Sequence, residues 1–598
     1  MRFVRPPALG AMLLAVFLTA PIAGAQALDQ VPGDALVVVR VKNLDQVSKK
    51  VATFAKGLGL DQQMPELGDP LTALADKAKM TKGLNRGGDM VIAMMDPEQF
   101  GGKPDQAVLM LIPTTDYKSF LTNFKAATDE GDGISKATPQ DGPEDVFVAN
   151  WGTYAALSPN KATLAKKPTG LKPTGFSAKE LEAKDVVMFA NIKAVRGKVL
   201  PEMKKNREQL LAQIQQGLEG EGAAKFVPVA KVAANQFLNV AEGFMRDAHS
   251  ATVSLNLTEG GIGMTYAADF DPTSYAGKMA LQNKPATGSL LAGLPDRKYF
   301  FFAGGASDPE QSAKAWGDLL DPVIKELAAV PEAAKFAKAM ESMKKGAGAT
   351  SGFALGYVAP TGALGQESVL QQVAVMRGDS KTIQSSQREM MGAMNDLMKM
   401  LPQQAGGQAG AMNFEYKPGA RTVGGVQFDA FETKINFAED DPQQQQAKQM
   451  LAFVYGPAGM TGVLGAVDPK TVVSVQGGDE KLISDAVTAS KANADTLGAQ
   501  AGVRAVGNEL PKNRSMEAYL DLGTLVSTGT RYARGFGLPV NVKLPADLPP
   551  IGFSAGTDAT AVRMDVHVPN RLVQGLMTAA LDAQRQMQNQ NNPGGGLE

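Results

Sequence analysis

The chain has 598 residues, a formal net charge of −1, two histidines and no cysteine. The near balance of 60 basic and 61 acidic residues gives no electrostatic footprint for nucleic acid or anionic lipid. The lack of cysteine excludes disulfides, thiolate metal ligands and thiol nucleophiles. A chain of this length can bury enough apolar surface to fold without such cross-links, and it has room for several domains.

Residues 1–27 have the features of a secretory signal peptide. Two arginines precede an apolar run at 11–20, and small residues follow it in two overlapping cleavage patterns, which end at Ala25 and at Ala27. The apolar run has about half of the roughly 20 residues that a membrane-spanning helix needs. We therefore expect cleavage after Ala25 or Ala27 and a periplasmic or extracellular mature protein without a transmembrane segment.

The rest of the chain contains two similar halves, recognised by five features that recur in one order. Each half opens with a proline-containing turn before an apolar run, at Pro32 and at Pro295. The second feature is an apolar run leading into Asp116 or Asp379, and these aspartates are as far apart as the two prolines. Five ordered matches predict an internal duplication. The remaining three pairs are apolar runs: 154–157 with 472–475, 186–192 with 516–522, and 253–269 with 553–569.

Within each half, the pattern predicts strands that run into helices. The strand candidates are short runs rich in Val, Phe and Met. Residues 44–58 carry apolar side chains at spacings of three and four, which is typical of a helix with one buried face. Asp116 and Asp379 stand where helix N-caps are expected. Turn signals at 258–261 and 557–560 predict hairpins.

These elements predict an α+β fold with mixed or antiparallel sheets flanked by helices. The first repeat unit is expected at 28–290 and the second at 291–583. The first contains two extra helical patterns between residues 199 and 247, and the second contains a Met-rich helix near 385–401 followed by a Gly/Gln-rich loop. The Gln/Asn/Gly-rich tail at 584–598 is predicted to be disordered.

One segment, 552–556, matches the G-x-S-x-G nucleophile elbow. That motif needs a strand, a strained turn and then a helix, so that the serine is exposed beside a base. Here the following residues predict a turn and another strand, and the counterpart of Ser554 in the first half is Ser254, within a plain strand pattern. His567 has an alanine as its counterpart, and His249 ends a helical segment. We therefore expect Ser554 to be a strand residue, and we assign no catalytic residue.

Metal sites have little support in the sequence. Two distant histidines do not form an imidazole cluster. Residues 439–441 are the densest acidic group, but they lack the spacing of a calcium loop and fit a solvated turn. Thioethers crowd one predicted helix and would suit Cu(I), although they also form an ordinary apolar stripe. These thioethers belong to Met390, Met391, Met394, Met398 and Met400.

The glycine-rich segment 346–352 resembles a phosphate-binding loop only in composition. It follows a predicted helix and precedes a predicted strand, which is the reverse of the order that directs a helix N-terminus at phosphate. We interpret it as a linker.

The Pro-Gly-Asp turn after a signal peptide at Pro32, repeated in part at Pro295, resembles the opening of uncharacterised secreted bacterial proteins of domain-of-unknown-function type. The resemblance covers most of the mature chain. It implies an exported protein of this architecture, and it brings no catalytic residues to transfer.

Together these observations predict an exported, non-enzymatic binding, scaffolding or envelope-associated protein. Its partner would be a protein, a peptide or a lipid, with no cofactor and no nucleic acid. One alternative is a carboxylate-dependent hydrolase, which a pocket with two facing carboxylates would favour. Another is Cu(I) binding through Met391, Met394 and Met398. A broad apolar groove would instead favour binding of lipid or peptide.

Overall fold

The computed structural model divides the chain into two compact units, and each unit is assembled from three separate segments. The first unit contains residues 1–201, 244–281 and 558–574, and the second contains 202–243, 282–557 and 575–598. The structure describes residues 24–591 except 142–144, 166–169, 219–223, 363–366, 401–411, 436–444, 446–447, 449–450, 453, 457–458, 536, 538–541, 543 and 546.

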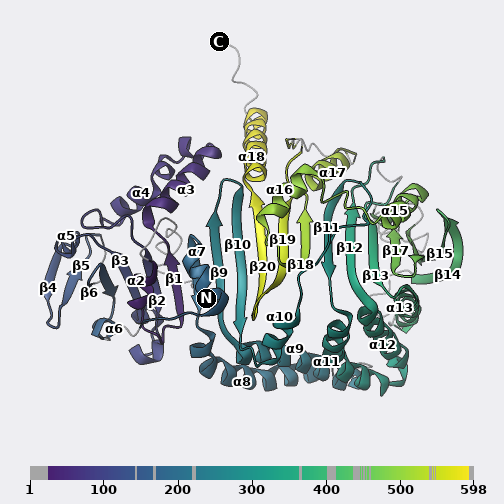
Figure 1. The fold of residues 1–598 in the computed structure, drawn as a ribbon, viewed down its shortest axis with the longest axis horizontal. Helices are drawn as coiled ribbons and strands as arrows, with labels where there is room; N and C mark the ends of the chain where they lie inside the picture. Colours follow the sequence, from purple (N-terminus) through teal and green to yellow (C-terminus); the bar gives the residue numbers. More distant parts are fainter. Residues whose placement is uncertain are drawn as a thin grey trace, which may run out of the picture. The chain divides into compact units, whose positions relative to one another are not determined.

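The first unit is built on one antiparallel sheet, whose described strands follow the order β4-β5-β6-β7-β3-β2-β1-β8-β9-β10-β20 (Figure 1). The strands are β1 (Val37–Val41), β2 (Met90–Met94), β3 (Val108–Pro113), β4 (Ala126–Asp129), β5 (Ile134–Thr138), β6 (Val146–Trp151), β7 (Tyr154–Ser158), β8 (Val186–Ala190), β9 (Ala248–Leu257), β10 (Gly261–Phe270) and β20 (Ala561–Pro569).

Helices cover parts of both faces of this sheet. On one face, apolar side chains such as Val38, Val187 and Phe189 pack with Ala27 of α2 and Leu181 of α7 into the main core of the unit. On the other face, α3 packs against the sheet in a separate cluster. The helices of this unit are α2 (Gly24–Asp29), α3 (Leu44–Gly57), α4 (Pro70–Lys77), α5 (Tyr117–Leu121), α6 (Lys161–Ala165), α7 (Gly175–Ala183) and α10 (Tyr275–Gln282).

Within the second unit, the described strands pair antiparallel in the order β14-β15-β16-β17-β13-β12-β11-β18-β19. Its core lies on one face and includes Phe302, Val375, Val475 and Tyr519. The strands are β11 (Tyr299–Ala306), β12 (Thr350–Val358), β13 (Gln371–Gly378), β14 (Met412–Val423), β15 (Val426–Ile435), β16 (Met460–Asp468), β17 (Thr471–Gln476), β18 (Arg514–Leu520) and β19 (Ile551–Asp558).

The helices of the second unit are α11 (Pro309–Ala328), α12 (Ala334–Ala349), α13 (Ser380–Met400), α15 (Glu480–Ala492), α16 (Ala501–Glu509) and α17 (Leu522–Gly535). Three further helices contribute residues to both units: α8 (Ile192–Leu218), α9 (Val227–Asp247) and α18 (Asn570–Asn591). Among the described residues, no helix has the length and apolar character required to cross a membrane.

The pairing order of β11 to β19 is the same, strand for strand, as that of β1 to β9. The five pairs of similar sequence features lie on or beside strands that hold equivalent places in the two orders: β1 and β11, β3 and β13, β7 and β17, β8 and β18, and β9 and β19. The predicted α+β fold with antiparallel sheets is confirmed.

Several local predictions are also confirmed. The helix expected at 44–58 is α3, which ends at Gly57. The carboxylate of Asp116 accepts from the Ser119 backbone N–H at 2.6 Å, and that of Asp379 accepts from the Thr382 N–H at 2.8 Å, so both aspartates cap helices. The Met-rich helix is α13. The Gly/Gln-rich loop expected after it lies outside the described residues.

Other boundaries differ from the prediction. The glycine-rich segment 346–352 is not a linker, because α12 runs to Ala349 and β12 begins at the next residue. Helix α18 continues to Asn591, so it includes the first residues of the tail that was predicted to be disordered. Gln, Arg and Met are good helix formers, and no proline follows before Pro593. Composition alone therefore placed the end of the helix too early.

Candidate functional site

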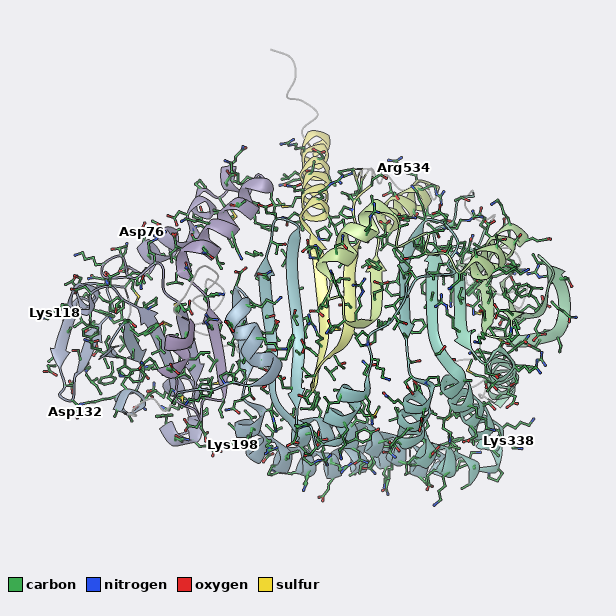
Figure 2. The ribbon with its side chains drawn as sticks, in the orientation of Figure 1. Asp76, Lys118, Asp132, Lys198, Lys338 and Arg534 are labelled. Atoms are coloured by element: carbon green, nitrogen blue, oxygen red, sulfur yellow. The ribbon has the colours of Figure 1, made fainter. Side chains whose placement is uncertain are left out.

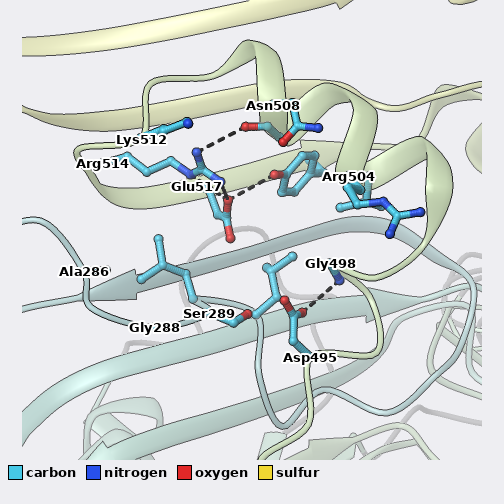
Figure 3. Close-up of a pocket in the computed structure, with 15 residues that line it drawn as sticks. Ala286, Gly288, Ser289, Asp495, Gly498, Arg504, Asn508, Lys512, Arg514 and Glu517 are labelled. Atoms are coloured by element: carbon cyan, nitrogen blue, oxygen red, sulfur yellow. Dashed lines mark hydrogen bonds and ion pairs between the residues drawn. The ribbon is translucent and has the colours of Figure 1, made fainter.

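A polar cavity of about 310 Å³ opens in the second unit beside β18 (Figure 3). Five parts of the chain line it: the segment that precedes β11, the turn that precedes α16, one side of α16, the loop between α16 and β18, and side chains of β18. The lining residues are Ala286, Gly288, Ser289, Leu290, Leu291, Asp495, Gly498, Val503, Arg504, Gly507, Asn508, Lys512, Arg514, Glu517 and Tyr519.

The buried side of the cavity is an ion pair on β18. Glu517, which is 6 % exposed, accepts a hydrogen bond at Oε2 from Arg514 Nε at 2.8 Å, and Arg514 Nη2 forms an ion pair with the same oxygen at 2.7 Å. The Tyr519 hydroxyl donates to the same oxygen at 3.0 Å. Burial raises the pKa of Tyr519, and the Glu517 carboxylate raises it further, so the hydroxyl remains a donor. Alternate residues of a strand face the same side, which explains why Glu517 and Tyr519 act together.

A glycine on the neighbouring strand allows one wall of the cavity to form. Gly304 of β11 lies directly opposite Glu517 in the sheet. A Cβ at this position would collide with the backbone carbonyl of Leu290. The absence of a side chain at Gly304 therefore lets the segment 286–291 pass close over the sheet, where it forms one wall of the cavity.

The open side of the cavity carries exposed polar side chains. Arg504, Asn508 and Lys512 are exposed. Asp495 lies on the opposite side from Arg514 and Glu517 (Figure 3), and its Oδ1 accepts from the Gly498 N–H at 2.8 Å. The cavity thus contains two carboxylates, as a hydrolase would. However, Glu517 accepts its hydrogen bonds from a guanidinium and a phenol, which is the arrangement of a structural ion pair and not of a general acid.

The first unit lacks this constellation at the equivalent place. The matched runs 186–192 and 516–522 align Val187 with Glu517 and Phe189 with Tyr519. Val187 lies opposite Arg40 of β1, so Arg40 holds the position that Gly304 holds in the second unit. The polar cavity therefore belongs to one unit only.

In place of a cavity, the first unit has a buried ion pair. Arg40 Nε and Nη2 donate to Oδ2 of Asp89 at 2.8 and 2.6 Å, and the backbone N–H of Asn43 donates to Oδ1 at 2.8 Å. Arg40 and Asp89 are 2 % and 0 % exposed. The long arginine side chain occupies the place that the backbone of Leu290 approaches in the second unit.

A second candidate site is an apolar band on the sheet of the first unit. It consists of Met188, Val253, Tyr266 and Met564, which lie directly opposite one another across β8, β9, β10 and β20. Directly opposed residues place their side chains on the same face. Met188, Tyr266 and Met564 are 44 %, 40 % and 48 % exposed, which is unusual for neighbouring large apolar side chains.

The rows on either side of the apolar band are also free of charge. One row consists of Val186, Leu255, Met264 and Val566, and the other of Ala190, Ala251, Ala268 and Val562. The first row approaches the cluster under α3, and the second approaches a cluster that contains Ile192 of α8 and Met245 of α9. Helices thus cover both ends of this face and leave the apolar band between them exposed.

The residues considered in the sequence do not form a catalytic centre among the described residues. Ser554 lies within β19 and is 3 % exposed, as expected of a strand residue. His567 is buried on β20, next to Gly261. His249 lies 3.4 Å from Asp271 and is half-exposed. Ser554, His567 and His249 lie on three different strands, and no serine–histidine–carboxylate arrangement is seen in the described parts.

The proposed metal ligands are only partly described. Residues 439–441 lie outside the described residues, as do the side chains of Met394 and Met398. Met390 lines a small cavity of about 160 Å³ together with Met343 and Met376. Methionines from α12, β13 and α13 therefore line the same small cavity, together with neighbours such as Ile383. Methionine fills irregular gaps of this kind well. No group of three or more His, Cys, Asp or Glu in the described parts could hold a metal ion.

Sequence reasoning missed Arg514, Glu517 and Tyr519. A signal was present, because Glu517 is a charged residue inside an apolar run whose counterpart in the first half is Val187. A buried charge needs a partner, so this difference between the halves could have identified the pocket. Arg40, within the apolar run of β1, is the corresponding signal in the first half.

Comparisons with known proteins add no identity. No family model and no curated protein matches the chain. Among solved structures, crystal form III of TP0453 is similar at 6 % identity with a TM-score of 0.18, over 49 % of this chain and 100 % of that chain. Crystal form IV of TP0453 has 8 % identity and a TM-score of 0.19, over 50 % and 99 % of the two chains. Likenesses at these TM-scores support no argument about fold or function.

Proposed function

We propose that this chain is an exported, non-enzymatic binding protein that takes an acyl chain of a lipid on the apolar band of its first unit. The observation that carries the proposal is the exposed row of Met188, Val253, Tyr266 and Met564. The signal-like residues 1–27 support export.

The chemistry of this face favours an acyl chain over a protein partner. The apolar band and its two flanking rows have a single polar group, the Tyr266 hydroxyl. A protein interface carries about one hydrogen bond per 100–200 Å², whereas a lipid chain needs none. At a strand spacing of about 4.8 Å, four strands give a width of roughly 14 Å for the chain to lie across. The unbranched thioethers of Met188 and Met564 can adapt to it.

We also propose a duplicated origin for the two units. Their strands follow the same pairing order, and five stretches of similar sequence mark equivalent places in it. In this proposal, the shared scaffold came first, and the apolar band and the polar cavity arose separately in the two copies.

Calorimetric titration of the mature protein with dodecanoate and octanoate tests the proposal. Each buried CH₂ contributes about 0.8 kcal/mol, so dodecanoate should bind much more tightly than octanoate. The isosteric variants Met188→Gln and Met564→Gln should weaken binding of dodecanoate at least about tenfold, because they place amides under the chain. Met516→Gln, at a methionine of β18 that is 40 % exposed, serves as the matched control.

Two results would overturn the proposal. One is equal binding by wild type and by the two band variants. The other is a concentration-dependent dimer, seen by analytical ultracentrifugation, that Met188→Gln and Met564→Gln abolish, since a second copy of the chain would then be the occupant.

A further inference from the structure

We propose that the polar cavity of the second unit binds a small zwitterion, such as an amino acid or a dipeptide with aliphatic side chains. Its ammonium group would face Glu517 and its carboxylate would face Arg504 and Lys512. This site is separate from the apolar band and does not depend on the function proposed for it.

The floor of the cavity presents an acceptor without a donor. The two hydrogen bonds and the further ion-pair contact to Glu517 all end at Oε2, so Oε1 accepts no hydrogen bond from a described residue. In Figure 3 this oxygen points toward the side of the cavity that holds Ser289 and Asp495. A donor group of a ligand in the cavity can bind this oxygen, and an ammonium group forms a strong, charge-assisted hydrogen bond with a carboxylate.

Arg514 cannot turn to meet the ligand. Its Nε and Nη2 bind Glu517, while its Nη1 donates to the backbone carbonyls of Gly507 at 3.3 Å and Pro511 at 2.9 Å. The guanidinium is therefore fixed in place by three partners. It holds Glu517 in position but has little capacity left for an anion.

The open side of the cavity supplies the cations for the ligand's carboxylate. Neither Arg504 nor Lys512 forms an ion pair or a side-chain hydrogen bond with a described residue. The guanidinium of Arg504 can bind a carboxylate through two parallel hydrogen bonds, and Lys512 adds a point charge. The two ends of the cavity thus have opposite preferences: a cation at Glu517 and an anion at the rim.

The size and walls of the cavity limit the ligand. A volume of about 310 Å³ is at the lower end of the range for small-molecule sites, roughly 300–1,000 Å³. Leu290, Leu291 and Val503 provide apolar wall between the polar ends. This combination fits a ligand with one or two short aliphatic side chains between an ammonium and a carboxylate.

Calorimetric titration with three matched probes tests both ends of the site. L-alanyl-L-alanine carries both charges, N-acetyl-L-alanyl-L-alanine lacks the ammonium, and L-alanyl-L-alanine amide lacks the carboxylate. We expect measurable binding of the first probe and at least about tenfold weaker binding of the other two, because each loses a charge-assisted hydrogen bond. Equal binding of the acetylated probe would overturn the proposal in favour of a simple anion site. No binding of any probe at millimolar concentration would overturn it altogether.

Variants at the rim link the binding to these residues without disturbing the fold, because both positions are exposed. Arg504→Gln and Lys512→Gln should each weaken binding of L-alanyl-L-alanine about tenfold and leave dodecanoate binding unchanged. Lys338→Gln is the matched control, since Lys338 is exposed on α12 and points away from the ribbon (Figure 2). Glu517→Gln should abolish the preference for the free ammonium, with circular dichroism to confirm that the variant is folded. Unchanged binding in both rim variants would contradict the assignment.

Discussion

The two units share a strand order, but they use the same place on the sheet in different ways. In the first unit, Arg40 projects from β1 and pairs with Asp89, so the interior is filled. In the second, Gly304 holds the equivalent place, and the charge comes from Glu517 on the neighbouring strand. One unit therefore has a fully buried ion pair and the other has an ion pair open to a cavity. The comparison shows that both units have a charged residue at this pair of opposed positions. The charge is on β1 in the first unit and on β18 in the second.

The largest expected effect comes from breaking the closed pair. Arg40→Met leaves the Asp89 carboxylate buried without its partner, and removing one member of a buried pair costs about 3–5 kcal/mol. Hydrogen exchange should rise in peptides from β1, β2 and β8 and should change little in peptides from β11 and β18. In the double variant Arg40→Met/Asp89→Leu, most of the protection should return, because no buried charge remains. If protection from hydrogen exchange stayed low in the double variant, the loss of stability would come from the packing of the arginine side chain and not from the unpaired charge of Asp89.

The equivalent change in the second unit should cost less. Arg514 is about one-fifth exposed and water reaches Glu517 from the cavity, so Arg514→Met should lower the stability of this unit by about 1.5–3 kcal/mol. Urea unfolding followed by hydrogen exchange in β18 measures the effect. An effect as large as that of Arg40→Met would mean that the cavity does not hydrate the pair, and the contrast between the units would disappear.

A third test concerns the edge hairpin β14–β15 of the second unit. Burial alone would raise the pKa of Asp429, but hydrogen bonds from Tyr416, Arg388 and the Gly419 N–H lower the pKa overall. The stabilisation is therefore complete well above the unfolded pKa of about 3.9 and is lost as the pH falls through the lower folded value. Asp429→Asn should cost about 1–2 kcal/mol at pH 7.

The difference between wild type and Asp429→Asn should shrink steadily below about pH 4. Urea titrations at pH 7 and pH 3 measure this change. A difference that is the same at both pH values would show that the carboxylate charge contributes nothing.

The smallest effects should be equal in the two units. Asp116 and Asp379 cap helices at equivalent places, and both are exposed caps that accept one backbone N–H. Asp116→Ala and Asp379→Ala should each cost about 1 kcal/mol, measured by denaturant midpoint. A clear inequality between them would indicate that the two helices contribute differently to their units.

The sequence was sufficient for those features that depend on local pattern. The helix α3, the caps Asp116 and Asp379, and the strands β3, β8, β9 and their counterparts all follow from periodicity and from capping chemistry. The hairpin β14–β15 was missed, although residues 412–417 and 426–430 alternate apolar and polar side chains as a strand with one buried face does. The local signal for these two strands was therefore present in the sequence and was overlooked.

The candidate sites depend on which strands become neighbours, and that is not a local property. The apolar band requires β20, late in the chain, to pair with β10, nearly 300 residues earlier. The polar cavity requires Gly304 and Glu517 to lie opposite each other. Each strand looks ordinary alone. Only the comparison of Val187 with Glu517 offered a hint in the sequence.

Gly304 also shows how a binding site can arise on this scaffold at low cost. Replacing one side chain by hydrogen at one position of a paired strand leaves the hydrogen bonds of the sheet intact, yet it removes enough volume for a loop to cross and for a ligand-sized space to form. The reverse exchange would refill the interior. Two units with the same strand order can therefore differ in their capacity for a ligand through single substitutions in one unit, while the other unit keeps its filled interior.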